Sequence, residues 1–300
     1  MADYQEYRRR ILRKRWRRNF AVAGLLVLLI LLSAVGLLWK RLPREPSPAA
    51  VQRPTIIQQE LQSSEWNTIS YTPARRLTVQ TTSAGSTAMD FRLAALDRTT
   101  AVDRSYFANV CFLGDSLTQG MQIYSSGLPE ASFCAYRGAN PSDVVNGTTC
   151  KRSDGGTEVP MEVLTARQPP VLYILLGTNV LNRDGDYSSF LTYYRLMLDM
   201  ISQALPNTQI YVQAITPVRP EVRNSHPGLY KERLCEINNE LAAIALEKNC
   251  AFLNLWEALA DDNGDLKAEY AQPDGIHIKP EGYPAWVEYL ATHTVGQQTA

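Results

Sequence analysis

The chain is poor in the side chains that build metal sites and disulfide frameworks. Its 300 residues include only 5 cysteines and 3 histidines, and no two cysteines form a C-x-x-C pair. This spacing argues against a structural zinc site, and five cysteines are too few for a disulfide scaffold. Cys111, Cys235 and Cys250 stand in apolar surroundings that suit small buried side chains. Cys134 and Cys150 flank a loop, and a disulfide between them is a hypothesis.

The sequence also lacks a net charge, because 30 Lys and Arg residues balance 30 Asp and Glu residues. This balance gives no sign of a nucleic-acid partner, and we expect none. The charges are unevenly distributed, however. Residues 1–19 form a basic segment with eight basic and two acidic side chains, a net charge of +6, which leaves −6 for the rest of the chain.

One long hydrophobic run follows this basic segment directly. Residues 20–39 contain no charged side chain, and a helix of that length spans the ~30 Å hydrocarbon core of a bilayer. We therefore predict a transmembrane helix at residues 20–39 in contact with the lipid bilayer. The basic residues before it predict a cytoplasmic N-terminus and an extracytoplasmic location for the chain beyond it. A cleaved secretory signal is the alternative, although its apolar region is normally shorter.

Beyond the apolar run, the chain divides by composition. Residues 40–104 are rich in Pro, Gln, Ser and Thr without a sustained period, which predicts an extended linker. Short apolar runs then alternate with helical patterns across residues 105–295, and residues 296–300 form a tail. We predict strands at 109–113, 132–136, 171–176, 209–215 and 251–255, and helices at 159–167, 187–205, 229–248 and 280–292. This alternation predicts one α/β domain with a central parallel sheet.

The stretch 109–120 organises that domain. Mostly apolar residues run into Gly114, Asp115 and Ser116, and helix-compatible residues follow, so we predict a buried strand, a tight turn and a helix. Such a turn presents the Ser116 hydroxyl at the edge where open α/β sheets bind ligands. The spacing fits neither phosphate-binding nor dinucleotide-binding loops, and Thr118 replaces the second Gly of the α/β-hydrolase elbow. An ordinary turn capped by Asp115 or Ser116 is the alternative.

A nucleophilic serine requires a base, and the chain offers three histidines. His226 lies in a loop and His293 near the tail, where both are plausible solvated side chains. His277 follows Asp274 in a short turn that contains Gly, so Asp274 can orient the imidazole while His277 takes the serine proton. The alternative is a surface loop in which Asp274 only caps the backbone.

Two further strand ends carry groups suited to bind an oxyanion. Asn179 follows the predicted strand 171–176, and a side-chain amide in that position is a suitable donor. Gly138 follows the predicted strand 132–136, and its bare backbone N–H can approach a substrate closely. A turn Asn that makes only local backbone hydrogen bonds is the alternative for Asn179.

In chain order these features form four blocks: Gly114-Asp115-Ser116-Leu117, Gly138, Gly177-Thr178-Asn179 and Asp274-Gly275-Ile276-His277. The sequence thereby resembles the SGNH, or GDSL, family of serine esterases and acylhydrolases. The resemblance implies a three-layer α/β/α flavodoxin-like fold in which Ser116 is the nucleophile, His277 the general base and then acid, and Asp274 its orienting group. The N–H groups of Ser116 and Gly138 and the Asn179 amide would form the oxyanion hole. Val180 departs from the family pattern, which often has Asp there.

The resemblance further implies hydrolysis of an acyl-ester substrate through an acyl-enzyme, without metal or organic cofactor. With the predicted anchor, it favours short-chain or acetyl esters on cell-wall or other envelope glycans. Acyl transfer to envelope sugars, lipid esterase or thioesterase activity, and non-catalytic wall binding are the alternatives. Residues 217–230, which include Arg219, Arg223 and His226, are expected to form a lip of the pocket or an ordinary solvated loop.

Overall fold

A parallel five-stranded sheet forms the centre of the computed structural model, which describes residues 80–81, 87–88, 90–124, 127–128 and 130–295. The strand order is β4 (Ser132–Ala135), β3 (Val110–Gly114), β7 (Val171–Leu175), β8 (Gln209–Gln213) and β9 (Ala251–Leu253). Along the chain, β3 is the first strand of this sheet. β4 then pairs with one edge of β3, and β7, β8 and β9 follow one another on its other side. This is the flavodoxin-like order, whose switch point lies between β3 and β7.

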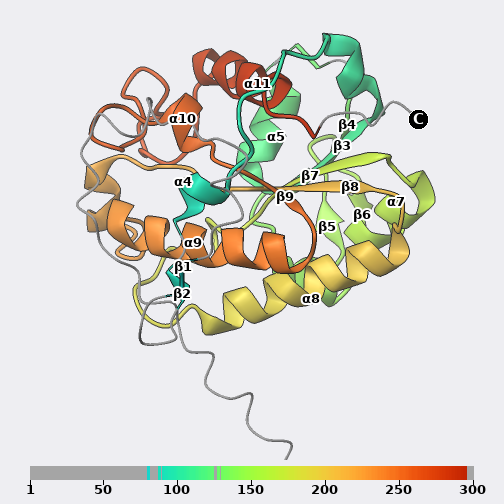
Figure 1. Ribbon diagram of the computed structural model, residues 1–300, viewed down its shortest axis with the longest axis horizontal. Coiled ribbons are helices and arrows are strands. Elements are labelled where there is room, and N and C mark those ends of the chain that lie inside the picture. The colour runs from blue at the N-terminus through green and yellow to red at the C-terminus, as the bar shows by residue number, and fades with distance from the viewer. Residues whose placement is uncertain (1–79, 82–86, 89, 125–126, 129, 296–300) are drawn as a thin grey trace, which may run out of the picture. The chain divides into compact units, whose positions relative to one another are not determined.

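Five longer helices cover the sheet on both faces: α5 (Ser116–Ile123), α7 (Pro160–Arg167), α8 (Ser188–Ala204), α9 (Lys231–Glu247) and α11 (Tyr283–Ala291). Figure 1 shows α8 and α9 on one side of the sheet and α5 and α11 on the other. The predicted strands and helices are confirmed to within about three residues. The largest difference is at the predicted helix 280–292, which begins with the 3-10 helix Pro280–Gly282 before α11. The α/β fold with a central parallel sheet is confirmed too. The three-layer arrangement follows from apolar residues on both faces of each strand.

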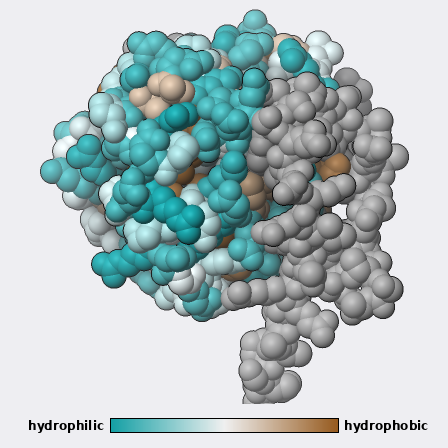
Figure 2. Space-filling model, turned by 90° about the vertical axis from the view of Figure 1, so that its left-hand side faces the viewer, coloured by the Kyte–Doolittle hydropathy of each residue, from teal (hydrophilic) through white to brown (hydrophobic). Residues whose placement is uncertain are grey.

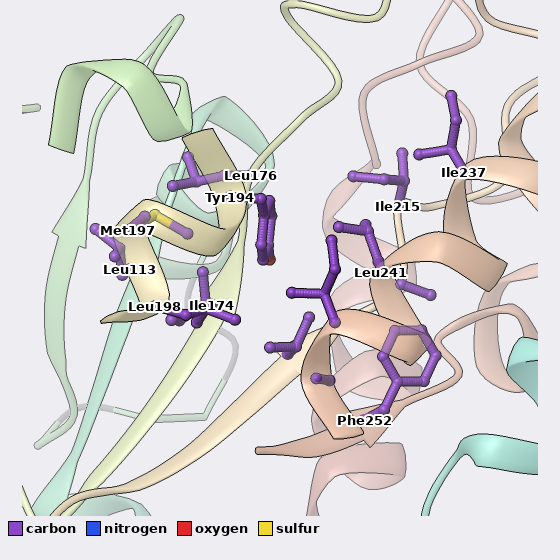
Figure 3. Close-up of a cluster of buried hydrophobic side chains, with 14 of the residues drawn as sticks. Leu113, Ile174, Leu176, Tyr194, Met197, Leu198, Ile215, Ile237, Leu241 and Phe252 are labelled. Carbon is purple, nitrogen blue, oxygen red and sulfur yellow. The ribbon is translucent and has the colours of Figure 1, made fainter. Parts of the chain in front are cut away.

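Alternate residues of β3 enter two different hydrophobic clusters, which explains the continuous apolar run in its sequence. Cys111 and Leu113 pack with α8 and α9, whereas Val110 and Phe112 pack with α5 and α11. The first cluster is drawn in Figure 3, where strand side chains lie against Tyr194, Met197 and Leu198 of α8 and Ile237 and Leu241 of α9. Each strand is thus buried on both sides, as a parallel sheet requires.

The segment 90–104 packs against this domain, although it lies in the predicted linker 40–104. Phe91 of α4 (Phe91–Ala94) is buried, and its N–H donates to the side chain of Asn239 at 2.7 Å. The N–H of Leu96 donates to the carbonyl of Phe252 in β9, and that of Val102 to Ala291. The linker prediction is therefore wrong for residues 90–104, because α4 is too short to show a helical period.

Other short elements also lacked a sequence signal. They are α6 (Pro141–Val145), α10 (Trp256–Leu259), two 3-10 helices (Arg104–Asn109 and Pro220–Asn224) and the two-residue strands β1 (Gln80–Thr81), β2 (Thr87–Ala88), β5 (Cys150–Lys151) and β6 (Thr157–Glu158). None is long enough for apolar periodicity to identify it.

The predicted membrane segment lies outside the described residues, as do the basic segment 1–19 and the tail 296–300. Within the part of the chain that the structure describes, no helix combines the length and the apolar character needed to cross a bilayer. The transmembrane helix at residues 20–39 therefore remains a prediction.

All five cysteines are free. Cys134 of β4 lies beside Cys111 of the neighbouring strand β3, with 3.7 Å between the sulfur atoms. Cys150 belongs to β5, where its thiol contacts the carbonyl of Thr148 at 3.6 Å. The hypothesis of a disulfide between Cys134 and Cys150 is thus wrong, because Cys134 is directed into the core.

Exposed large hydrophobic side chains are few and scattered among the described residues. They are Ile123, Tyr124, Val180, Leu196 and Val295. Figure 2 shows one face of the molecule, whose coloured residues are mostly hydrophilic with small, separate apolar patches. That face therefore lacks, in its described part, the broad apolar patch that marks many interaction surfaces.

Candidate active site

Ser116 stands at the turn between β3 and α5, as the sequence predicts. Asp115 is the N-cap of α5, and its carboxylate accepts a hydrogen bond from the N–H of Leu117 at 3.0 Å. The turn needs a glycine before it, because a Cβ on Gly114 would lie 2.0 Å from the Thr118 hydroxyl and 2.9 Å from the Leu175 carbonyl. This packing leaves the Ser116 side chain half-buried at the carboxyl end of β3.

His277 meets Ser116 although 161 residues separate them in sequence, with 2.9 Å between Nε2 and the serine Oγ. On the other side of the ring, Nδ1 lies 2.6 Å from Oδ2 of Asp274. A carboxylate can only accept, so Nδ1 carries the proton and Nε2 is left to accept from the serine hydroxyl. Ser116, His277 and Asp274 therefore form one continuous hydrogen-bond relay.

The Asp274 carboxylate is held in its ionised form by its own turn. Its Oδ1 accepts hydrogen bonds from the N–H groups of Ile276 and His277, both at 2.9 Å. Burial opposes ionisation, but these backbone bonds and the His277 side chain hold the pKa of Asp274 below its ordinary value of 3.8. An ionised carboxylate beside Nδ1 stabilises the positive charge that the imidazole acquires when it takes a proton.

The loop at residues 217–230 packs against the turn that carries Asp274 and His277. The N–H of Arg219 donates to the carbonyl of Gly275 at 2.9 Å. Gly275 has a φ of +72°, and a Cβ there would lie 2.6 Å from Val222 and 2.9 Å from the Cβ of Arg219. The Arg219 guanidinium donates a hydrogen bond to the carbonyl of Leu266 at 2.8 Å. Part of the expected lip is thus packed scaffold for the histidine turn.

The two remaining predicted residues lie near the serine turn but do not contact Ser116 through a hydrogen bond. Gly138 is exposed after β4 with a φ of +81°, a conformation that favours glycine. The Asn179 amide, after β7, donates to Oδ2 of Asp115 at 3.1 Å and contacts the carbonyl of Ala139 at 3.4 Å. Asn179 therefore connects the serine turn with the loop that carries Gly138.

Asp115 has a larger part in this arrangement than the capping role considered from the sequence. Its side chain is fully buried and accepts from both Leu117 and Asn179. Burial raises its pKa to about 6, although the Leu117 N–H and His277 favour the charged form. Its place in the Gly-Asp-Ser block was the only sign in the sequence that Asp115 belongs to the site. The fold shows in addition that it orients the Asn179 amide.

The other two histidines lie apart from the relay. His226 is half-buried, and its Nδ1 lies 2.9 Å from the hydroxyl of the neighbouring Ser225. His293 is buried rather than solvated, with Nδ1 2.8 Å from the carbonyl of Tyr289 and its ring stacked on the Tyr289 ring. The prediction that His293 is solvated is therefore wrong. Residues 99 and 102 cover the end of α11 through hydrogen bonds to its last carbonyl groups, which the sequence did not indicate.

Comparisons with known structures give three examples of similar chains. A GDSL-like lipase from Bacteroides thetaiotaomicron is 15% identical, with 60% of this chain and 84% of that chain covered and a TM-score of 0.47. A carbohydrate esterase family 3 protein from Talaromyces cellulolyticus is 17% identical, with 61% and 93% covered and a TM-score of 0.41. The lipase/acylhydrolase from Enterococcus faecalis is 13% identical, with 61% and 92% covered and a TM-score of 0.43. At these identities and TM-scores the similarities carry no conclusion about this chain's substrate.

No curated protein matches the sequence. By contrast, residues 112–285 match the GDSL-like Lipase/Acylhydrolase family, and this segment is more than half of the chain. It begins within β3 and extends into α11, so it includes the serine turn, Gly138, Asn179 and the histidine turn. The chain therefore belongs to the GDSL-like lipase/acylhydrolase family and is a serine ester hydrolase.

Proposed function

We propose that this protein is a membrane-anchored, extracytoplasmic esterase that removes short acyl groups, acetyl above all, from cell-envelope carbohydrate. The hydrogen-bond relay from Ser116 through His277 to Asp274 is the single observation that carries the chemical part of this proposal. The location and the substrate are supported by the sequence of residues 1–39, which combines a basic segment with a bilayer-length apolar run.

Acylation begins when Ser116 Oγ attacks the ester carbonyl carbon and His277 Nε2 takes the hydroxyl proton. The contact of 2.9 Å between these atoms allows direct transfer. Asp274 stabilises the resulting imidazolium through its 2.6 Å contact with Nδ1. Nε2 then gives the proton to the leaving alcohol oxygen, and an acyl-Ser116 ester remains. Water attacks this ester with His277 again as base, which releases the acid and restores the serine.

The tetrahedral oxyanion requires hydrogen-bond donors, and we assign three groups to this role. The N–H of Ser116 opens α5, where an N–H has no partner within the helix. Gly138 offers a backbone N–H from an exposed turn. The Asn179 amide keeps one hydrogen on Asp115 at 3.1 Å, while its weaker contact with Ala139 at 3.4 Å can be exchanged for the oxyanion. One such donor contributes roughly 3 kcal/mol to the transition state.

Hydrolysis of p-nitrophenyl acetate tests the chemical part. Ser116→Ala should lower kcat on the order of 10⁴-fold or more without loss of folded protein, because the nucleophile is removed. His226→Ala is the matched control, since His226 lies outside the relay, and it should retain wild-type turnover. Undiminished turnover in Ser116→Ala would overturn the assignment.

Acetate release from purified wall material, compared with a series of p-nitrophenyl esters of increasing acyl length, tests the substrate. The proposal predicts acetate release and a preference for the shortest acyl groups. A preference for long acyl chains would instead favour a lipid esterase, and acyl transfer to added sugars that outpaces hydrolysis would favour a transferase. Either result contradicts the carbohydrate-deacylating role.

Membrane fractionation with N-terminal sequencing tests the anchor. Full-length protein should remain in the membrane fraction after a high-salt wash, with its original N-terminus. A mature N-terminus beyond residue 48 would show that the apolar run is a cleaved signal and would remove the anchor from the proposal.

A further inference from the structure

Arg233 is a buried charge that no step of the proposed reaction uses. It lies in the first turn of α9, and its side chain is 5% exposed. Nη1 donates to the carbonyl of Gly228 at 2.7 Å and to that of Leu181 at 3.0 Å, and Nη2 to that of Gly185 at 3.3 Å. The Asp184 carboxylate, which is largely exposed, lies 3.9 Å from Nε.

A buried cation in this position does not stabilise α9 itself. A guanidinium stays protonated, and burial of a charge costs free energy unless its hydrogen bonds are satisfied. A cation in the first turn of α9 also faces the positive end of the helix dipole. Besides the Asp184 carboxylate, the contacts that offset both effects are carbonyl oxygens from two separate loops, so the side chain joins those loops.

The first loop carries Asn179. It follows β7, and the N–H groups of Val180 and Leu181 both donate to the carbonyl of Gly177 at 3.1 Å. These two bonds close the tight turn on which Asn179 stands. Arg233 binds the carbonyl of Leu181, so it holds this turn from two residues beyond the candidate oxyanion donor.

The second loop, at residues 217–230, supports the histidine turn through Arg219 and Val222, which pack against Gly275. At its other end, Gly228 touches the first loop. The N–H of Gly228 donates to the carbonyl of Asn182 at 3.2 Å. A Cβ on Gly228 would lie 2.2 Å from the carbonyl oxygens of both Leu181 and Arg183, so only glycine permits this approach.

We propose that Arg233 is a positioning residue that fixes the turn carrying Asn179 relative to the loop behind the Asp274–His277 turn. It thereby sets the distance between the oxyanion donor and the general base. This inference rests on the proposed esterase function and adds to it a specific residue outside the motif blocks. Arg233 acts by positioning Asn179 relative to His277 and does not contact the reacting atoms.

The positioning role predicts a change in turnover rather than in substrate binding. A displacement of about 1 Å at a reacting group can lower the rate roughly 100-fold, whereas ground-state binding changes little. Arg233→Met should therefore lower kcat about 10- to 100-fold per titrated active site, with KM nearly unchanged. Arg233→Lys should recover part of the loss, because one ammonium group reaches fewer carbonyls than the planar guanidinium.

Two further variants separate positioning from simple destabilisation. Gly228→Ala keeps the arginine itself but forces apart the two loops that it joins, so this variant should reproduce the loss of kcat. In an Asn179→Ala background, Arg233→Lys should have at most about a threefold effect, because the group through which it acts is gone. Arg195→Met is the matched control: it removes an arginine that pairs at 3.1 Å with Glu247 on the surface, and kcat should not change.

Steady-state hydrolysis of p-nitrophenyl acetate by the full-length chain, with active sites counted by fluorophosphonate labelling, decides the matter. Wild-type kcat in both Arg233→Lys and Gly228→Ala would overturn the inference, and these two variants decide if Arg233→Met fails to fold. A loss that appears only as fewer labelled sites would overturn it too, since that is a folding defect. Failure of the proposed function is distinct: the wild type and Ser116→Ala would then show equal turnover.

Discussion

Replacement of Asp115 by Asn is expected to remove a pH-dependent loss of stability while it impairs turnover. The carboxyl group is fully buried, and burial raises its pKa from 3.8 to about 6. Because the folded state binds this proton more tightly than the unfolded state, the resulting stabilisation is complete below pH 3.8 and is lost as the pH rises through about 6. A shift of about two units corresponds to roughly 3 kcal/mol of unfolding free energy.

Asp115→Asn cannot titrate, so its free energy of unfolding should rise relative to wild type by roughly 3 kcal/mol between pH 4 and about pH 7. Urea unfolding at a series of pH values, followed through the fluorescence of the buried Trp256 and Trp286, measures that difference. At each pH in this range, kcat of Asp115→Asn should be lower than that of the wild type on the order of 10²-fold, because the Asn179 amide loses the carboxylate oxygen that orients it.

A matched control and a clear refutation are available for this prediction. Asp199→Asn removes a half-exposed carboxylate that pairs with Lys248 on the surface, and kcat should not change. If the difference in unfolding free energy between wild type and Asp115→Asn stays constant from pH 4 to about pH 7, the burial argument is wrong. If kcat is also unchanged, Asp115 does not orient Asn179.

Three other predictions concern packing and the thiols. Gly120→Ala should lower the free energy of unfolding by about 1–3 kcal/mol in urea, because its Cβ would lie 1.9 Å from the buried hydroxyl of Tyr283; Tyr283→Phe in that background should recover part of the loss. Asn238→Ala should lower it by about 2–4 kcal/mol, since Asn238 satisfies both the N–H and the carbonyl of Ile215 at 2.7 and 3.0 Å, and wild-type stability would contradict this. Titration of the denatured, unreduced protein with a thiol reagent should count five free cysteines, and a count of three would show a disulfide.

The sheet and the long helices could be predicted from the sequence because their apolar residues follow a regular period. The run 109–113 is apolar on every residue that the parallel strand buries, and Leu234, Ile237 and Leu241 recur on one face of α9. Such patterns depend on local repeats, which a single sequence contains. The segment at residue 91 has no such repeat, and only its tertiary contacts, such as the hydrogen bond to Asn239, show that it belongs to the folded domain.

The candidate site could be predicted in its residues but not in its connections. Ser116, Asn179 and His277 were identified because each polar group follows an apolar strand or stands in a recognisable block. The hydrogen bond from Asn179 to Asp115 joins residues 64 positions apart, and no spacing rule connects them. Arg233 was missed for the same reason, since its three acceptors are backbone carbonyls, which carry no sequence signal.

The disulfide hypothesis failed for a related physical reason. Cys134 and Cys150 both border a loop in the sequence, but the alternation of β4 directs Cys134 into the core, where it is fully buried beside Cys111. The direction of a strand side chain depends on the register of the sheet, and a one-residue difference reverses it. Sequence proximity to a loop therefore did not determine which thiols meet.

The most direct test of the central claim is to map the adduct that a fluorophosphonate forms on the full-length protein by peptide mass spectrometry. The 2.9 Å contact between Ser116 and His277 predicts a single adduct on Ser116 that forms much more slowly in His277→Ala. An adduct on another residue, or equal labelling rates in wild type and His277→Ala, would contradict the account.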